Sequence, residues 1–430
     1  MAEARRNHQQ SMSAPTVLIV DAYSTGRYLT GALSARGVTS RHIQSAPIIP
    51  DVAKATFLPQ EFLSNDVCLD GSGAEVDRLT EVSRQYRPVA VLAGSETGVE
   101  LADTLSERLG LPSNGVRMSR ARREKHLMQE ALRENNIPSI PHFESADIET
   151  VLEWSRSYPA GVVLKPPASA GAEDVYFCHS ENEVRRAFAT IYRKRNALNL
   201  VNETVVAQEL VTGNEFIVNA VSSRGVHRIT DIWRCTKLRL PGAGRLSALE
   251  ALLPYSGVEQ SALVHYTYRV LHALRMQYGP SHLELIVTPR GPLLMELAAR
   301  LQGAIHLGAL ECALDRTHVE WTADAYLGRD EFFDSALQGY VSKQAVYRVF
   351  LIASTTGRLV ATPRIEDLTR LDSYYSHSLY VSPGGSIRKT VDYFTSPGLV
   401  HLVSSDVSVL DRDYQWIRDR ERDDFFVVEA

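Results

Sequence analysis

Residues 281–300 contain two apolar runs joined by the sequence Pro-Arg-Gly, a pattern that predicts a β-hairpin. If residues 289–291 form a three-residue loop, Glu284 and Glu296 stand directly opposite each other on one face of the hairpin. Two like charges buried together destabilise a sheet unless a cation lies between them. Paired carboxylates with room for water suit Mg²⁺, which usually also takes phosphate oxygens. The hairpin therefore predicts a magnesium site, and the alternative is an exposed hairpin with two solvated glutamates.

The face that carries the glutamates continues along both strands, because side chains alternate between the two faces of a strand. Ala298 and then Arg300 follow Glu296 at intervals of two, so the guanidinium of Arg300 would lie near a metal-bound phosphate. His282 shares the face of Glu284 and could line a substrate pocket, although a lone histidine more often serves packing.

Length and composition describe an ordinary soluble protein of two or three domains. Of the 430 residues, 44% are apolar and 23% charged, and a formal net charge of -5 without a basic stripe argues against a nucleic-acid partner. No apolar run is long enough to cross a membrane, and the polar start lacks the apolar core of a secretory signal. The four cysteines are scattered without a CxxC pair, which fits reduced thiols. We therefore expect a cytoplasmic protein.

Strand and helix patterns divide the chain into parts. Residues 16–20 and 89–93 are buried-type strands, each followed by a loop and a helix, so residues 15–118 are predicted to form a parallel α/β domain. The first strand is followed by only one glycine, which disfavours a nicotinamide-dependent dehydrogenase. Residues 345–410 hold short β-runs with Gly and Pro between them and predict a β-rich lobe. The other predicted elements are helices at 119–135, 181–195 and 259–277 and strands at 162–165, 204–210 and 215–221.

Lysine is rare in this chain, since only seven of its 46 basic residues are lysines. Where arginine supplies most of the positive charge, a lysine at a motif position suggests that a compact ammonium group is needed. A lysine at a strand end, a loop of small residues, an acidic strand end and the two glutamates follow one another in this order. Together they indicate a site for a nucleoside triphosphate.

In their order and spacing these features resemble the ATP-grasp superfamily over about residues 15–330, and within it the L-amino acid ligases, which are dipeptide-forming carboxylate–amine ligases. The segments Ser-Pro-Gly-Leu-Val-His-Leu-Val at 396–403 and Asp-Arg-Asp-Tyr-Gln-Trp-Ile-Arg at 411–418 are similar to the extra lobe of that subgroup. The resemblance implies an α/β protein with the ATP-grasp fold. The implied parts are a disordered tail (1–14), an N-terminal parallel α/β domain (15–118), two ATP-binding lobes (119–210 and 211–333) and a β-rich C-terminal lobe (334–430).

The resemblance assigns phosphate-binding roles to two lysines and a loop. Lys125 lies in a helix that resembles the family motif DK-x-x-x-R-x-x-L-x-x-x-G-I-P, with Glu124 in the place of its Asp. Lys165 ends the strand Val-Val-Leu-Lys and resembles the second phosphate lysine, whereas Lys125 could also be an ordinary helix-surface residue. Ser169 and Gly171 lie in a loop that resembles the one closing over the phosphates, where small residues can present backbone N–H groups to an anion. The alternative for this loop is a plain surface turn.

The segment 208–216 resembles the strand that links the two ATP-binding lobes. In the family, the positions of Gln208, Glu209 and Val211 hold adenine, partly through backbone groups, and the position of Glu215 takes the ribose hydroxyls. A carboxylate can accept both hydroxyls at once, although Glu215 could also be a strand-edge charge. Lys237 could be a further phosphate or substrate contact, or a surface residue.

Glu284 and Glu296 match the family's Mg²⁺ ligands, and Arg300 matches the arginine that steadies the acyl phosphate and the tetrahedral intermediate. Many members have Asn two residues after the second glutamate, where this chain has Ala298. Amino acid ligases commonly read Glu-x-Ala-Ala-Arg here, so this departure favours that subgroup and leaves a second metal one protein ligand short.

The implied reaction is ATP-dependent ligation through an acyl phosphate, with Arg300, Lys165 and His282 as candidate catalytic residues. ATP and Mg²⁺ are the implied cofactors, with one or two ions that Mn²⁺ could replace. The implied partners are a small-molecule carboxylate and amine, and a homodimer is a family-level expectation. Three alternatives stay open: a ligase for another carboxylate or nucleophile, a biotin-dependent carboxylase, and a nucleotide-binding protein that does not turn over.

Overall fold

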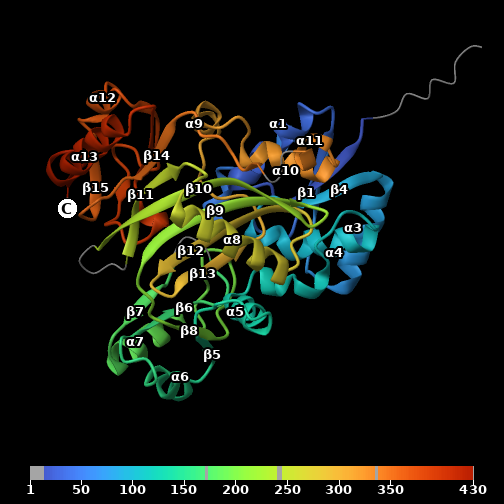
Figure 1. Cartoon of the computed structure of the whole chain (residues 1–430), viewed down its shortest axis with the longest axis horizontal. Coiled ribbons are helices and arrows are strands. Elements are labelled where there is room, and N and C mark those ends of the chain that lie inside the picture. The colour runs from blue at the N-terminus through green and yellow to red at the C-terminus, as the bar shows by residue number, and fades with distance from the viewer. Residues whose placement is uncertain (1–13, 170–172, 240–244, 335–337, 430) are drawn as a thin grey trace, which may run out of the picture.

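The computed structural model describes residues 14–169, 173–239, 245–334 and 338–429. It begins with a four-stranded parallel sheet of order β3-β2-β1-β4, flanked by helices (Figure 1). In the central strand β1 every residue after Thr16 is buried, as its continuous apolar sequence leads one to expect. The predicted parallel α/β fold is confirmed here. The elements are β1 (Thr16–Val20), α1 (Tyr28–Ser34), β2 (Thr39–Gln44), α2 (Asp51–Lys54), β3 (Asn65–Val67), α3 (Gly73–Gln85), β4 (Pro88–Ala93) and α4 (Val99–Leu109).

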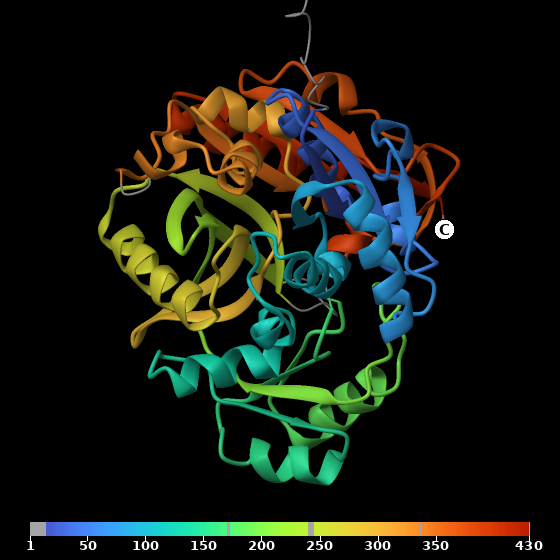
Figure 2. The same ribbon diagram turned by 90° about the vertical axis from the view of Figure 1, so that its right-hand side faces the viewer.

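A second, antiparallel sheet has the strand order β5-β8-β6-β7. Two helices pack on it around an apolar core of its own. In Figures 1 and 2 this lobe (green) lies at the bottom of both views, while the N-terminal sheet (blue) and the C-terminal part (red) lie at the top. Its elements, with the helix that precedes them, are α5 (Lys125–Glu134), β5 (His142–Ser145), α6 (Ile148–Ser155), β6 (Val162–Lys165), β7 (Tyr176–Cys178), α7 (Glu181–Ile191) and β8 (Val205–Glu209).

The central sheet is antiparallel and has eight strands in the order β13-β12-β9-β10-β11-β14-β18-β16. The β-runs expected at the C-terminus thus extend this sheet and also form a three-stranded sheet, β17-β15-β19. The strands are β9 (Asn214–Ser223), β10 (Val226–Arg239), β11 (Arg245–Leu253), β12 (Gly279–Thr288), β13 (Gly291–Ala298), β14 (Ala345–Phe350), β15 (Gly357–Ala361), β16 (Tyr374–Leu379), β17 (Ser386–Ile387), β18 (Gly398–Ser404) and β19 (Val427–Glu429). The helices are α8 (Val258–Ala273), α9 (Leu307–Ala313), α10 (His318–Leu327), α11 (Asp330–Asp334), α12 (Ile365–Leu368) and α13 (Val407–Asp423).

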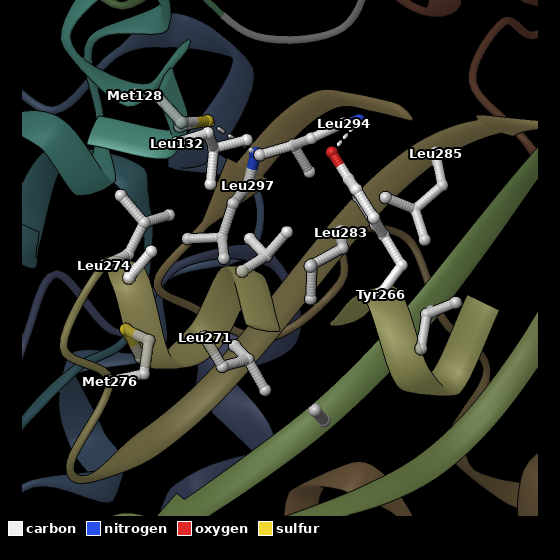
Figure 3. Close-up of a cluster of buried hydrophobic side chains, with 14 of the residues drawn as sticks. Met128, Leu132, Tyr266, Leu271, Leu274, Met276, Leu283, Leu285, Leu294 and Leu297 are labelled. Carbon is white, nitrogen blue, oxygen red and sulfur yellow. Dashed lines mark hydrogen bonds between the residues drawn. The ribbon is translucent and has the colours of Figure 1, made fainter. Parts of the chain in front are cut away.

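The hairpin β12–β13 is held in place by the apolar core beneath it. Leu283, Leu285, Leu294 and Leu297 are fully buried in the cluster that also contains residues of α5 and α8 (Figure 3). Burying each such side chain contributes about 1.5–3 kcal/mol. Because neighbouring side chains in a strand point to opposite faces, this packing turns the glutamates of the hairpin away from the core.

The turn of this hairpin differs from the prediction. Thr288 pairs with Gly291, so the loop has two residues rather than three. Gly291 has φ +98°, a conformation that favours glycine. A β-bulge at Met295 then adds one residue to the second strand, and the register shifts by one. The two deviations cancel, and Glu284 stands opposite Glu296 as predicted.

Helix boundaries differ from the predicted ones as well. α5 begins at Lys125 rather than at 119, because Glu124 has an extended backbone and Arg122 is fully buried in a short 3₁₀ turn. α7 and α8 end earlier than predicted, α7 shortly before Arg193, whose φ is +57°. None of the helices in the described part of the chain is both long and apolar enough to span a membrane.

Candidate active site

A cavity of about 190 Å³, here called the first cavity, is lined by strands of both the small sheet and the central sheet. It brings together twelve of the thirteen site residues expected from the sequence, although they are spread over residues 125–300. The thirteenth, Gly171, lies outside the described residues. The twelve are Lys125, Lys165, Ser169, Gln208, Glu209, Val211, Glu215, Lys237, His282, Glu284, Glu296 and Arg300.

Two facing carboxylates open into the first cavity. The side chain of Glu284 is 41% exposed and that of Glu296 is 28% exposed, because both point into open space rather than into packed protein. Burial would raise the pKa of Glu284, but the hydrogen bond with His282 and the charges of His282, Lys237 and Arg300 lower it overall. Glu284 is therefore suited to carry negative charge at neutral pH.

This carboxylate pair fits a hard cation that keeps water and phosphate ligands. No group of three or more His, Cys, Asp or Glu side chains in the described parts of the chain is placed to hold a metal ion. Two carboxylates facing a cavity would therefore leave room for water and phosphate oxygens around an ion held there. Mg²⁺ is bound in this way in many phosphate-handling sites.

Two lysines lie beside the carboxylates. Lys125 is the first residue of α5, and its Nζ lies 3.1 Å from Glu296 Oε1 and donates to the carbonyl oxygen of Ser169 at 3.5 Å. Lys165, the last residue of β6, is 7% exposed. Burial lowers the pKa of Lys165 to about 8, the charge of Lys125 adds to this effect, and Glu296 and Glu284 oppose it. Such a pair of buried ammonium groups favours an anion in the cavity.

The remaining lining of the first cavity is mostly apolar, with one unsatisfied donor. Gln208 is 4% exposed, and its Nε2 is buried without a hydrogen-bond partner among the described residues. Buried donors are nearly always satisfied, so this group favours a ligand with an acceptor there. The backbone N–H of Glu209 donates to the carbonyl oxygen of Pro141, and its side chain pairs with Arg290 at 3.1 Å. The apolar lining residues are Ile140, Val163, Val175, Phe177, Leu210, Val211, Leu246, Ile286, Met295, Ala298 and Val391.

Glu215 and Lys237 face each other from neighbouring strands. Lys237 Nζ lies 3.2 Å from Glu215 Oε2 and 5.9 Å from the ring centre of Tyr393. The side chain of Lys237 is only 16% exposed, so it is not the surface residue that the sequence left open. The pair offers a carboxylate and an ammonium group to the same part of a ligand.

Arg300 is held by a carboxylate that the sequence did not single out. Arg300 Nε lies 3.3 Å from Glu96 Oε2, and Arg123 Nε lies 4.0 Å from the other oxygen of Glu96. Burial raises the pKa of Glu96, and the charges of Arg300 and Arg123 oppose this rise. Glu96 follows β4 at the carboxyl end of the parallel sheet, where ligands of open α/β sheets bind. This position in the sequence could have identified Glu96 as a candidate site residue.

A buried hydrogen-bond network orients His282. Asn219 donates both of its amide hydrogens, to Asp231 Oδ1 at 2.5 Å and to Gln302 Oε1 at 2.6 Å. Its Oδ1 can therefore only accept, and it accepts from His282 Nδ1 at 2.9 Å. The other ring nitrogen, Nε2, lies 3.6 Å from Glu284 Oε1. Asn219 was not identified as a site residue from the sequence. A polar residue inside an apolar strand could have indicated a buried hydrogen-bonding role.

A second cavity of about 280 Å³ adjoins the first, because His282, Glu284, Arg300 and Tyr393 line both. It lies between the carboxyl end of the N-terminal sheet and residues of the C-terminal part, and Glu96 lines it. A reacting group at the shared residues is therefore accessible from both cavities.

Comparisons with known proteins find related sequences and a similar fold. A family model described as an ATP-grasp domain matches residues 158–307. The sequence is 29% identical over 422 residues to dapdiamide A synthase of Enterobacter agglomerans, covering 95% of this chain and 96% of that protein. It is 20% identical over 214 residues to the L-arginine-specific L-amino acid ligase of Bacillus subtilis, covering 50% and 51% of the two chains.

The fold is similar to the crystal structure of the L-amino acid ligase from Bacillus licheniformis. The TM-score is 0.75 at 14% identity, over 97% of this chain and 99% of that chain. Both the ATP-grasp fold and the relationship to L-amino acid ligases expected from the sequence are confirmed. Residues 158–307 therefore match an ATP-grasp domain, the chain has the ATP-grasp fold, and its relatives in sequence and in fold include L-amino acid ligases.

Proposed function

We propose that this protein, an ATP-grasp ligase that forms carbon–nitrogen bonds, activates the carboxylate of an amino acid as an acyl phosphate and joins it to an amine. The observation that carries the proposal is the convergence of Glu284, Glu296, Lys125, Lys165 and Arg300 at one cavity that opens into a second. The first cavity would hold ATP and the second the carboxylate substrate. The products are an amide, ADP and phosphate.

In the first step a substrate carboxylate oxygen attacks the γ-phosphorus of ATP, and the bond to the β-phosphate oxygen breaks. Mg²⁺ held by Glu284 and Glu296 would neutralise phosphate charge. Lys125 and Lys165 bind the phosphate oxygens, and Arg300 stabilises the charge that develops where the two cavities meet. Phosphoryl transfer needs little more from a protein than in-line positioning and charge neutralisation.

In the second step the amine nitrogen attacks the carbonyl carbon of the acyl phosphate, the carbon–oxygen bond breaks and phosphate leaves. The amine also loses a proton in this step. In its neutral form His282 is the candidate to receive it, because its Nδ1–H is committed to Asn219, which leaves an unprotonated Nε2 at the junction of the cavities. Arg300 steadies the tetrahedral intermediate in the same place.

Glu96 supports an amino acid, rather than a plain acid, as the carboxylate substrate. It lines the second cavity next to Arg300, and its buried Oε2 accepts no hydrogen bond from the described residues. An α-ammonium group beside a carboxylate held at Arg300 would supply that missing donor. The same substrate would thus satisfy both members of the ion pair.

The proposal is tested by measuring phosphate release from ATP and Mg²⁺ with the twenty amino acids, singly and in pairs, and by mass spectrometry of the products. We expect amino-acid-dependent release together with the mass of a dipeptide. Acids that lack the α-amino group serve as the matched comparison for the role of Glu96. Tight ATP binding without release for any pair would contradict the ligase proposal.

A further inference from the structure

The second cavity has apolar walls from opposite ends of the chain. The N-terminal domain contributes Tyr23, Pro50, Val52 and Ala53, and the C-terminal part contributes Phe350, Tyr393 and Phe394. The substrate carboxylate proposed above would lie at the junction with the first cavity. The rest of that substrate must then extend between these walls.

The aromatic wall is a rigid element. Asp392 caps the 3₁₀ turn Tyr393–Thr395 by accepting hydrogen bonds from the backbone N–H and the hydroxyl of Thr395, both at 2.8 Å. The hydroxyl of Tyr393 donates to Ser247 Oγ at 2.5 Å, and its ring packs edge-on against Phe350 with ring centres 4.9 Å apart. Of the two aromatic residues on the turn, Tyr393 lines both cavities and Phe394 lines only the second. The backbone of Phe394 is thus held in place by its neighbours, and its side chain lines the space for the substrate.

The remaining charges of the second cavity neutralise each other. Glu250 and Arg348 are opposed on strands β11 and β14 and form an ion pair. Arg348 also donates to the carbonyl oxygens of Gly303 at 2.9 Å and Ala304 at 3.1 Å. Of the other charged groups, Glu284 and Arg300 line both cavities, and Glu96 pairs with Arg300 and takes the α-ammonium group in the function proposed above. A charged substrate side chain would therefore enter this cavity without a free partner of opposite charge.

We propose that the second cavity receives an uncharged, apolar side chain of the activated amino acid, and that Phe394 is a residue that determines this specificity. This inference rests on the proposed function. Burying a charge without a partner is costly, whereas apolar walls favour an apolar group. Because Phe394 does not line the first cavity, changing it should alter the choice of amino acid and leave the use of ATP intact.

Hydroxylamine can replace the amine substrate as the nucleophile. The selectivity for the amino acid whose carboxylate is activated is then measured independently of the selectivity for the amine. Hydroxylamine attacks the acyl phosphate, forms the carbon–nitrogen bond of a hydroxamate, loses a proton and releases phosphate. We expect kcat/KM for leucine, methionine or phenylalanine to exceed that for aspartate, glutamate, lysine and arginine by about 10-fold or more. Phe394→Ala should lower kcat/KM for the best apolar substrate about 10-fold with KM for ATP unchanged. Phe394→Lys should raise the ratio of kcat/KM for glutamate to kcat/KM for leucine by at least about 10-fold.

Phe333→Ala is the matched control, because Phe333 is a half-buried phenylalanine that lines neither cavity. Circular dichroism and a melting curve identify variants that fail to fold, and the wild-type selectivity tests the inference without any variant. Hydroxamate formation mainly from charged amino acids would overturn the inference and leave the ligase activity standing. Unchanged selectivity in folded Phe394→Ala and Phe394→Lys would overturn the role of Phe394. No hydroxamate from any amino acid would instead overturn the ligase proposal itself.

Discussion

The charge of the buried Lys165 side chain depends on pH in the range where the enzyme would work. The unfolded chain would keep this ammonium group protonated up to about pH 10.4, but in the folded protein its pKa is lowered to about 8. Between these values the unfolded state binds one more proton, so the stability contribution of Lys165 rises with pH across this window. Anion binding changes in the opposite direction, because it needs the protonated form.

We therefore expect the affinity for ADP, measured with metal ions chelated, to fall as pH rises through about 8, by up to tenfold per pH unit. Isothermal titration calorimetry between pH 7 and 9.5 measures this affinity. Lys165→Met should bind ADP weakly and lose most of the pH dependence. A wild-type affinity that stays constant across this range would show that Lys165 does not bind the phosphates.

The two glutamates of the hairpin are the residues on which the metal assignment depends. Glu284→Gln together with Glu296→Gln keeps the shape of both side chains but removes both charges, so ATP consumption should fall at least about 100-fold. Steady-state ADP formation at saturating Mg²⁺ measures this loss. Glu130→Gln with Glu134→Gln on α5 is the control, because neither residue lines the first cavity. Unchanged turnover in the Glu284/Glu296 variant would refute the metal site.

Among the elements, the hairpin β12–β13 explains why a pairing can be predicted better than the turn that produces it. The alternation of leucine and glutamate specifies which residues face the core, and this constraint survives local changes in the loop. Whether the extra residue lies in the turn or in a bulge depends on local hydrogen bonds, such as the one from the N–H of Arg290 to Thr288 Oγ1. The bulge also lets the neighbours Met295 and Glu296 both line the first cavity.

The link between β8 and β9 contains a close backbone approach at Gly213. A Cβ atom there would lie 2.1 Å from the carbonyl oxygen of Val287 on β12. Gly213→Ala should therefore destabilise the protein by about 1–3 kcal/mol and weaken ADP binding, since Val211 and Glu215 flank it in the first cavity. Chemical denaturation and ADP titration measure the two effects.

Gly31→Ala is the matched control for this element. Gly31 lies in α1, and a Cβ atom there meets no other atom within 4 Å, so this change should stabilise the protein by about 0.5–1 kcal/mol. A Gly213→Ala protein with the stability and ADP affinity of the wild type would show that the link between β8 and β9 can move away from Val287 without loss of stability or binding.

At the scale of the whole molecule, the sequence predicted the first cavity more fully than the second. The residues of the first cavity belong to short motifs whose order along the chain could be recognised. Glu96, Asn219 and Phe394 belong to no such motif. Asn219 reaches His282 through the pairing of β9 with β12, and the packing of the N-terminal, central and C-terminal parts brings Glu96 and Phe394 to the cavity that Arg300 lines. Contacts between residues far apart in the chain leave no local periodicity, so they could not be read from one sequence.

The order of covalent steps is the central claim, and an oxygen isotope tests it most directly. An amino acid of the panel that supports turnover is labelled with ¹⁸O in its carboxylate and incubated with the protein, ATP, Mg²⁺ and the amine. If the carboxylate is activated as an acyl phosphate, one ¹⁸O atom per turnover must appear in inorganic phosphate, and ADP must form in equal amount. Label in AMP, or phosphate released without label while the amide forms, would contradict the account.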